Sequence, residues 1–182
     1  MARLPIPSLE NAAADSKPLL AKVEAQLGVV PNLFRLVGLS PAALEGYLGL
    51  NGALGKTLDV RTRERIALAV AEANGCSYCL SAHTYLATNL AKLDDDEIAL
   101  NRKGESKDAK GYAAVHFARR VAETRGKVTA ADLDAVKRAG YSDAQVVEIT
   151  LAVALNFLTN LVNNVAETDI DFPAVHPFRA AA

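Results

Sequence analysis

The chain has 182 residues, a formal net charge of −1 and 51% hydrophobic residues, with only 5% aromatic residues. This length fits one domain, residues 1–182, whose core needs no disulfide bonds for stability. Lysine and arginine form no cluster, and no apolar run approaches the roughly 18 residues that span a bilayer, so we expect no nucleic-acid or membrane partner. The prolines near the N-terminus are not typical of a signal peptide, and we expect a cytoplasmic protein with reduced cysteines.

Helical periodicity recurs along most of the chain. Gly28 ends the first predicted helix, Ser40 followed by Pro41 starts the third, and a capping box from Ser142 to Gln145 starts the longest. Apolar spacing and these signals predict helices at residues 17–27, 32–37, 41–54, 62–73, 76–93, around 98–100, 111–124, 129–139 and 142–167.

The remaining segments are irregular. Residues 101–110 form one polar loop, and the residues from about 169 onward, which include Pro173 and Pro177, form an irregular tail. No segment alternates convincingly between apolar and polar residues, which is the pattern of a half-buried strand. Alanine and leucine dominate the apolar residues, which favours close helix packing. We therefore predict an all-α helical bundle.

The most informative residues are the only two cysteines, Cys76 and Cys79, and the nearby His83. The CxxC spacing allows two thiols to form a small-ring disulfide bond and reopen it, or two thiolates to share a metal. On a helix the three side chains fall within about 60° of one another, so they share one face. The break at Asn74 and Gly75 places both cysteines in the first turn of a central helix. There the free N–H groups and the positive end of the helix dipole stabilise a thiolate.

A cysteine nucleophile also needs a proton acceptor, and two glutamates are candidates. If the chain reverses at residues 74–75 into a helical hairpin, Glu64 and His83 lie about 16 Å and 12 Å from the turn, on facing helices. Glu64 is then placed to hold the imidazole in a relay from Glu64 to His83 to Cys79. Glu72 precedes the break, and we interpret it as an exposed residue at a helix end.

The spacing of Glu64, eleven intervening residues, Cys76-x-x-Cys79 and then x-x-x-His83 resembles the signature of a known family. It is similar to the alkylhydroperoxidase D-like (AhpD) branch of the carboxymuconolactone decarboxylase superfamily. Segments common in peroxidase-related members have similar counterparts here, so the resemblance touches nearly the whole chain: residues 30–34 (VPNLF), 39–41 (LSP) and 168–173 (TDIDFP).

The resemblance implies an all-helical AhpD-like bundle that assembles as trimers or multiples of trimers. It also implies reduction of a small organic hydroperoxide, with electrons from an external dithiol or thioredoxin-like reductant. Cys79 would be the peroxidatic cysteine, Cys76 the resolving cysteine, and Glu64 and His83 the proton relay, with a redox disulfide between Cys76 and Cys79. We expect no cofactor and no metal. The best-known members carry a second histidine at the position of Tyr78.

Other functions remain open. One is a general CxxC disulfide oxidoreductase without peroxidase activity. Another is a zinc-stabilised module, in which His116 or Glu64 would have to complete a site made by Cys76, Cys79 and His83. A lactone decarboxylase is disfavoured, because that branch of the superfamily is not marked by a CxxC motif.

The other polar residues have simpler structural interpretations. We interpret His116 as a satisfied helix histidine, His176 as solvated and Tyr78 as a packing residue. The acidic run at residues 94–97 is typical of a helix N-terminus. A polar stripe on the last helix is explained by interhelical or inter-subunit hydrogen bonds: Asn156, Asn160, Asn163 and Asn164.

Overall fold

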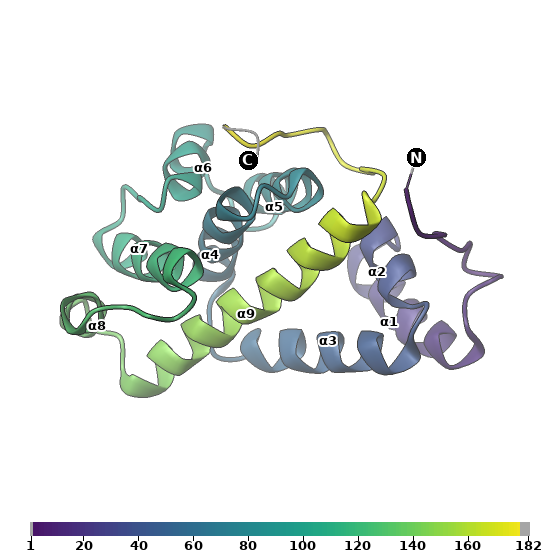
Figure 1. Ribbon diagram of the computed structural model, residues 1–182, viewed down its shortest axis with the longest axis horizontal. Helices are drawn as coiled ribbons and strands as arrows, with labels where there is room; N and C mark the ends of the chain where they lie inside the picture. The colour runs from purple at the N-terminus through teal and green to yellow at the C-terminus, as the bar shows by residue number, and fades with distance from the viewer. Residues whose placement is uncertain (1, 179–182) are drawn as a thin grey trace.

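The computed structural model describes residues 2–178. Over these residues the chain forms nine α-helices and one short 3-10 helix, with no β-strand, which confirms the predicted all-α class (Figure 1). The elements are η1 (Ala14–Ser16), α1 (Lys17–Leu27), α2 (Asn32–Val37), α3 (Pro41–Leu54), α4 (Val60–Ala73), α5 (Ser77–Asn89), α6 (Asp95–Arg102), α7 (Ala109–Thr124), α8 (Ala130–Arg138) and α9 (Asp143–Ala166).

Helix boundaries differ from the prediction where a local signal was missed. The predicted bounds of α1, α2 and α3 agree with the structure, but α4 begins at Val60 because the side chain of Asp59 caps it by accepting a hydrogen bond from the amide of Thr62. Helix α5 ends at Asn89 rather than near residue 93, because Lys92 adopts a left-handed φ of 55° that no helix can include.

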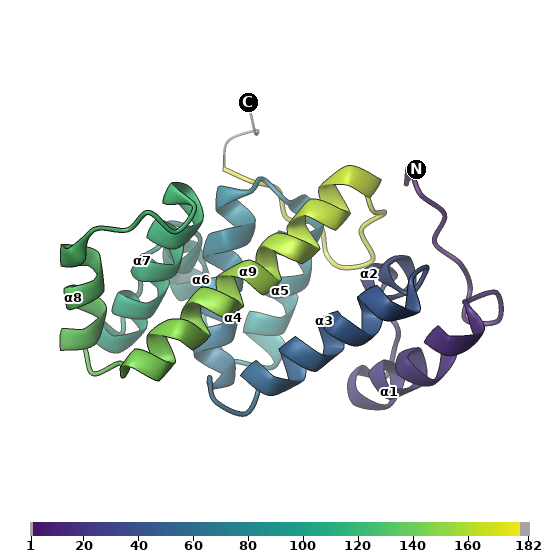
Figure 2. The same cartoon turned by 60° about the horizontal axis from the view of Figure 1, so that its bottom comes forward.

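Helix α4 lies at the centre of the bundle and packs against α5, α6, α7 and α9. Most of its side chains are buried, including two charged ones, Glu64 and Arg65. Helix α9 crosses the bundle diagonally and contacts α2, α3, α4, α5, α7 and α8 (Figures 1 and 2). Because α4 and α9 each contact many elements, the residues on their facing surfaces are fixed from several sides.

By length and composition, α9 is the one helix within residues 2–178 that could cross a membrane. The prediction that no apolar run approaches the roughly 18 residues that span a bilayer counted only uninterrupted runs. In α9, polar residues interrupt the apolar ones. A third of its most apolar stretch is buried inside the bundle. The buried face includes the amides of Asn160 and Asn163, so α9 carries polar groups into the interior.

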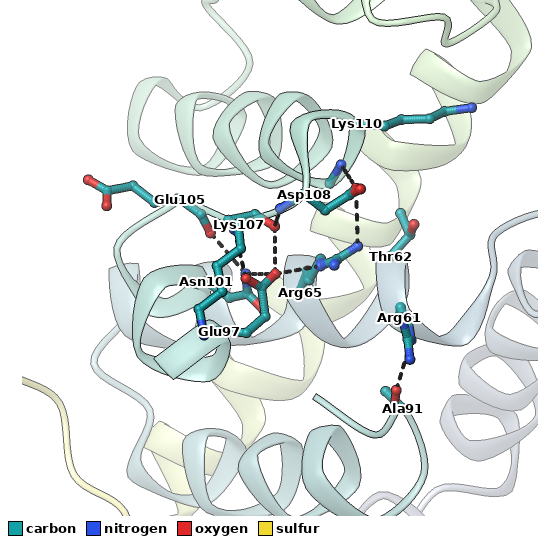
Figure 3. Close-up of polar contacts among 12 residues, drawn as sticks. Arg61, Thr62, Arg65, Ala91, Glu97, Asn101, Glu105, Lys107, Asp108 and Lys110 are labelled. Atoms are coloured by element: carbon teal, nitrogen blue, oxygen red, sulfur yellow. Dashed lines mark hydrogen bonds and ion pairs between the residues drawn. The ribbon is translucent and has the colours of Figure 1, made fainter. Parts of the chain in front are cut away.

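A buried polar network joins α4, α6 and the loop before α7 (Figure 3). The side chain of Glu97, only 4% exposed as a residue, accepts hydrogen bonds from Arg65 Nε at 2.9 Å, Asn101 Nδ2 at 3.0 Å and the backbone amide of Lys107 at 2.8 Å. It also accepts one from the hydroxyl of Ser106. Our interpretation of residues 94–97 as a helix N-terminus alone is therefore incomplete. Asp94 does cap α6, but Glu97 faces the core.

Residues 168–178 form no helix and run back along α5 toward α6 (Figure 1). The backbone amide of Val175 donates to Ser81 Oγ at 2.9 Å, and Arg102 donates to the backbone carbonyl of His176 at 2.7 Å. The side chains of Ile170, Phe172 and Val175 pack against the apolar cluster that contains both cysteines. This tail therefore covers the end of α5 that carries the CxxC motif.

Candidate functional site

The turn between α4 and α5 sets the position of both cysteines. Helix α4 ends at Ala73, and Gly75 takes a left-handed φ of 61°, where glycine has no steric penalty. Cys76 is the N-cap of α5, and its sulfur accepts a hydrogen bond from the amide of Cys79 at 3.4 Å. Both sulfurs therefore lie at the positive end of the α5 dipole.

The structure brings Glu64 and His83 together on facing helices. Glu64 Oε2 lies 2.8 Å from His83 Nδ1, and both side chains are largely buried. Burial opposes the charged imidazolium, but the charge of the Glu64 carboxylate and its hydrogen bond outweigh this effect and raise the pKa of His83. The contact leaves Nε2 as the nitrogen free to exchange a proton with a reacting group.

The two cysteines are reduced, adjacent and chemically different. The hydrogen bond from the Cys76 thiol is the largest cause of the lowered pKa of Cys79. Burial opposes this effect, and the positive charge of His83 lowers the pKa further. The same hydrogen bond, followed by burial, raises the pKa of Cys76. Of the pair, Cys79 is the sulfur that ionises and Cys76 the one that stays a thiol.

An amide from α9 also contacts the sulfur of Cys79. Asn163 Nδ2 donates a hydrogen bond to Cys79 Sγ at 3.2 Å. The predicted interhelical hydrogen bonds are thus present, but one of them ends on the sulfur of Cys79, which sequence reasoning missed. Asn156 differs from the prediction because its amide binds the Ala152 carbonyl within α9. Sequence spacing carries no signal for the Asn163 contact, which depends on how α9 crosses α5.

A small cavity of about 50 Å³ lies beside the carboxylate and the imidazole, between α3, α4 and α9. Burial, together with the negative charges of Cys79 and Glu64, raises the pKa of Tyr47 in its wall. Its polar wall consists of Tyr47, Asn51, Arg63, Glu64, His83, Asn156 and Thr159. Four apolar residues complete the lining, so this small cavity has both polar and apolar walls.

Several residues considered in the sequence have structural positions. Tyr78 is buried, accepts a hydrogen bond from the Leu33 amide at 3.0 Å and packs edge-on against Phe172, in agreement with its interpretation as a packing residue. His176 is exposed, as predicted. The prediction of an exposed Glu72 is wrong, because this side chain lies 2.7 Å from Arg102 with both groups about nine-tenths buried.

The zinc alternative requires a fourth ligand beside Cys76, Cys79 and His83. Within residues 2–178, no group of three or more His, Cys, Asp or Glu side chains is arranged to hold a metal ion. His116 stacks on Tyr112 in α7, with ring centroids 5.3 Å apart.

Comparisons with known proteins agree with this fold. Residues 41–124 match the carboxymuconolactone decarboxylase family. A solved structure described as an alkylhydroperoxidase AhpD core, an uncharacterized peroxidase-related protein from Ralstonia eutropha JMP134, superimposes with a TM-score of 0.82. It is 26% identical over 93% of this chain and 92% of that chain.

Two further relatives extend the comparison. A variant of the debrominase Bmp8, in complex with 2,3,4-tribromopyrrole, superimposes with a TM-score of 0.77 over 93% of this chain and 91% of that chain; at 21% identity it shows the shared fold alone. An uncharacterized protein from Haemophilus influenzae is 51% identical over 45 residues, which are 24% of this chain and 40% of that protein.

The helical bundle and the family match define a class of helical enzymes. The chain is AhpD-like in fold, and its residues 41–124 are those of the carboxymuconolactone decarboxylase family.

Proposed function

We propose that this protein is a thiol-dependent peroxidase that reduces a small organic hydroperoxide with Cys79 as the nucleophile. The observation that carries the proposal is the asymmetry between two adjacent sulfurs. The pKa of Cys79 is lowered and that of Cys76 is raised, so a thiolate lies beside a thiol near neutral pH. Peroxide reduction needs this combination, because the thiolate attacks the peroxide and the thiol captures the oxidised product.

The first step uses the relay residues. Glu64 holds His83 by its Nδ1 atom, and His83 takes the proton of Cys79. The thiolate then attacks the terminal oxygen of the hydroperoxide, so that an S–O bond forms and the O–O bond breaks. The departing alkoxide takes the proton from His83 and leaves as an alcohol. Cys79 becomes a sulfenic acid.

The second step returns the site toward its resting state. The sulfur of Cys76 attacks the sulfenic sulfur of Cys79, the S–O bond breaks, and hydroxide leaves with the thiol proton as water. An external dithiol then reduces the disulfide and is itself oxidised to a disulfide. We propose that this reductant is thioredoxin-like and that the protein works in the cytoplasm.

Burial restricts access to both sulfurs. Cys76 is 0% and Cys79 2% exposed, so a folded protein, whether a disulfide substrate or the thioredoxin-like reductant, reaches either sulfur only after a local opening. The small cavity beside His83 is lined by neither cysteine, and we propose that a small hydroperoxide reaches Cys79 from it, past the imidazole. A general CxxC disulfide oxidoreductase is therefore the second candidate.

The test is a titration of the reduced protein with cumene hydroperoxide, followed by peptide mass analysis. We expect one equivalent to remove the mass of two hydrogen atoms from the peptide with residues 76–79. Cys79→Ser should abolish peroxide consumption, and Cys76→Ser should stop at a sulfenic acid that dimedone traps. Unchanged peroxide consumption by Cys79→Ser would reject the proposal, and rapid exchange with a model disulfide without peroxide consumption would favour the second candidate.

We also propose a homo-oligomer, a trimer or a multiple of a trimer. The support is a seam of exposed apolar side chains on α9, each between 41% and 64% exposed: Val147, Leu151, Leu158, Leu161 and Val165. Their spacing of three, four or seven residues places them on one stripe, the pattern by which helices pair across an interface. Light scattering after size-exclusion chromatography measures the subunit number.

A further inference from the structure

Two buried amides lie one turn apart on α9, and one of them contacts the sulfur of Cys79. Asn163 is 2% exposed and donates from Nδ2 to Cys79 Sγ at 3.2 Å. Its Oδ1 atom is buried and has no hydrogen-bond partner among the described residues. Asn160 is 0% exposed, and its Nδ2 atom is also buried without a partner among them. Buried donors and acceptors are normally paired, so these atoms call for an explanation.

The turn before the cysteines determines how the second amide is oriented. Asn74 Nδ2 donates to Asn160 Oδ1 at 2.9 Å, and Asn164 Nδ2 donates to the backbone carbonyl of Asn74 at 3.0 Å. Because the oxygen of Asn160 is held by Asn74, its NH₂ group is turned away from that turn. After the Cys76 thiol, which has the largest effect, and His83, the side chains of Asn163 and Asn160 also lower the pKa of Cys79.

The free oxygen of Asn163 matches the chemistry of the first step. In a primary amide the N–H donor and the C=O acceptor lie side by side. A hydroperoxide that approaches Cys79 brings an O–H group next to the sulfur, and the same O–H stays there as the hydroxyl of the sulfenic acid. One amide can therefore donate to the sulfur and accept from the oxygen that becomes bonded to it. Within the described residues of the reduced protein, no group donates a hydrogen bond to Asn163 Oδ1.

We propose that Asn163 is a catalytic residue, which donates to the Cys79 thiolate through Nδ2 and accepts the O–H of the hydroperoxide through Oδ1. Asn74 and Asn160 form a positioning pair that directs a second amide toward the same sulfur. The role toward the hydroperoxide rests on the proposed peroxidase function, whereas the role toward the thiolate does not.

The experiment separates the two roles. The pH dependence of Cys79 alkylation by iodoacetamide, followed by peptide mass analysis, measures the thiolate without any peroxide. Asn163→Leu keeps the size of the side chain and should move the alkylation curve upward by about one to two pH units, because a charge-assisted hydrogen bond is lost. Asn163→Asp keeps the acceptor but adds a like charge, and should move the curve in the same direction by more.

The control is Thr150→Ala on the same helix, whose hydroxyl binds the Val146 carbonyl within α9, and its curve should overlay that of the wild type. Asn74→Ala should cause a smaller upward shift than either change at position 163. Curves of folded Asn163→Leu or Asn163→Asp that overlay the wild type would overturn the inference. If the wild type has a low Cys79 pKa but consumes no hydroperoxide, the proposed function fails while the role of Asn163 toward the thiolate stands.

Discussion

Replacing Glu97 by glutamine tests whether the buried network of α6 holds the central helix. The change keeps the size of the side chain and removes the charge that faces Arg65 at 2.9 Å (Figure 3). The Arg65 guanidinium is about nine-tenths buried, so it would remain in the interior with one weaker partner, Asp108, at 3.8 Å. The loss therefore leaves a buried charge only partly compensated.

The expected loss of stability follows from this geometry. Removal of one partner of a buried ion pair typically costs about 3–5 kcal/mol. We expect the lower end, about 3 kcal/mol, because Asp108 and the glutamine oxygen retain part of the interaction. For a chain of this size, that loss lowers the melting temperature by about 6–12 °C.

Urea denaturation followed by circular dichroism measures the free energy of unfolding. Asp95→Asn is the matched control, because it removes the same charge from an exposed position in the same turn of α6 and should change stability by less than about 0.5 kcal/mol. Equal stabilities of the two variants would refute the assigned role of the network.

The pH dependence gives a second check. Burial opposes the charged form of Glu97, but the hydrogen bonds from Ser106, Lys107, Asn101 and Arg65 outweigh it and lower its pKa. A carboxylate whose folded pKa is lowered contributes stability above its unfolded pKa of about 4.3 and loses it as pH falls through the folded value. The difference between wild type and Glu97→Gln should therefore shrink below about pH 4.

Three further changes test other parts of the structure. A Cβ at Gly111 would lie 2.6 Å from Arg65 Nη1, so Gly111→Ala should cost about 1–3 kcal/mol in urea denaturation, and an unchanged midpoint would contradict the packing. Glu64→Gln removes the charge that raises the pKa of His83, so Cys79 alkylation at pH 7 should slow by about tenfold; an unchanged rate would exclude the relay. Leu161→Glu puts a charge into the exposed α9 seam and should reduce the mass seen by light scattering, unless the seam is not the interface.

The sequence predicted the parts of the site that depend on local spacing. Cys79 and His83 lie one turn apart on α5, Cys76 caps that helix, and Glu64 faces His83 because the two residues lie at similar distances from a single turn. These inferences need only helix geometry and one break at Asn74 and Gly75.

The rest depends on contacts between distant segments, for which spacing carries no information. The contact of Asn163 with Cys79 joins residues 84 positions apart, and it exists only because α9 crosses α5 at that height. Glu97 looked like an ordinary acidic residue of a helix N-terminus, and its burial depends on how α6 packs on Arg65. Glu72 was misinterpreted for the same reason, since its partner Arg102 lies on another helix.

The neighbouring residues Glu64 and Arg65 give α4 a fixed rotational setting about its own axis. The glutamate is held by His83 on one side, and the arginine is held by Glu97 about 100° further around the helix. These two contacts at different angles fix the rotation of α4 about its axis. The Glu64 carboxylate therefore meets the His83 imidazole at a constant angle. Substitutions in the α6–α7 loop can consequently change the contact between Glu64 and His83 from a distance, without altering either of these residues.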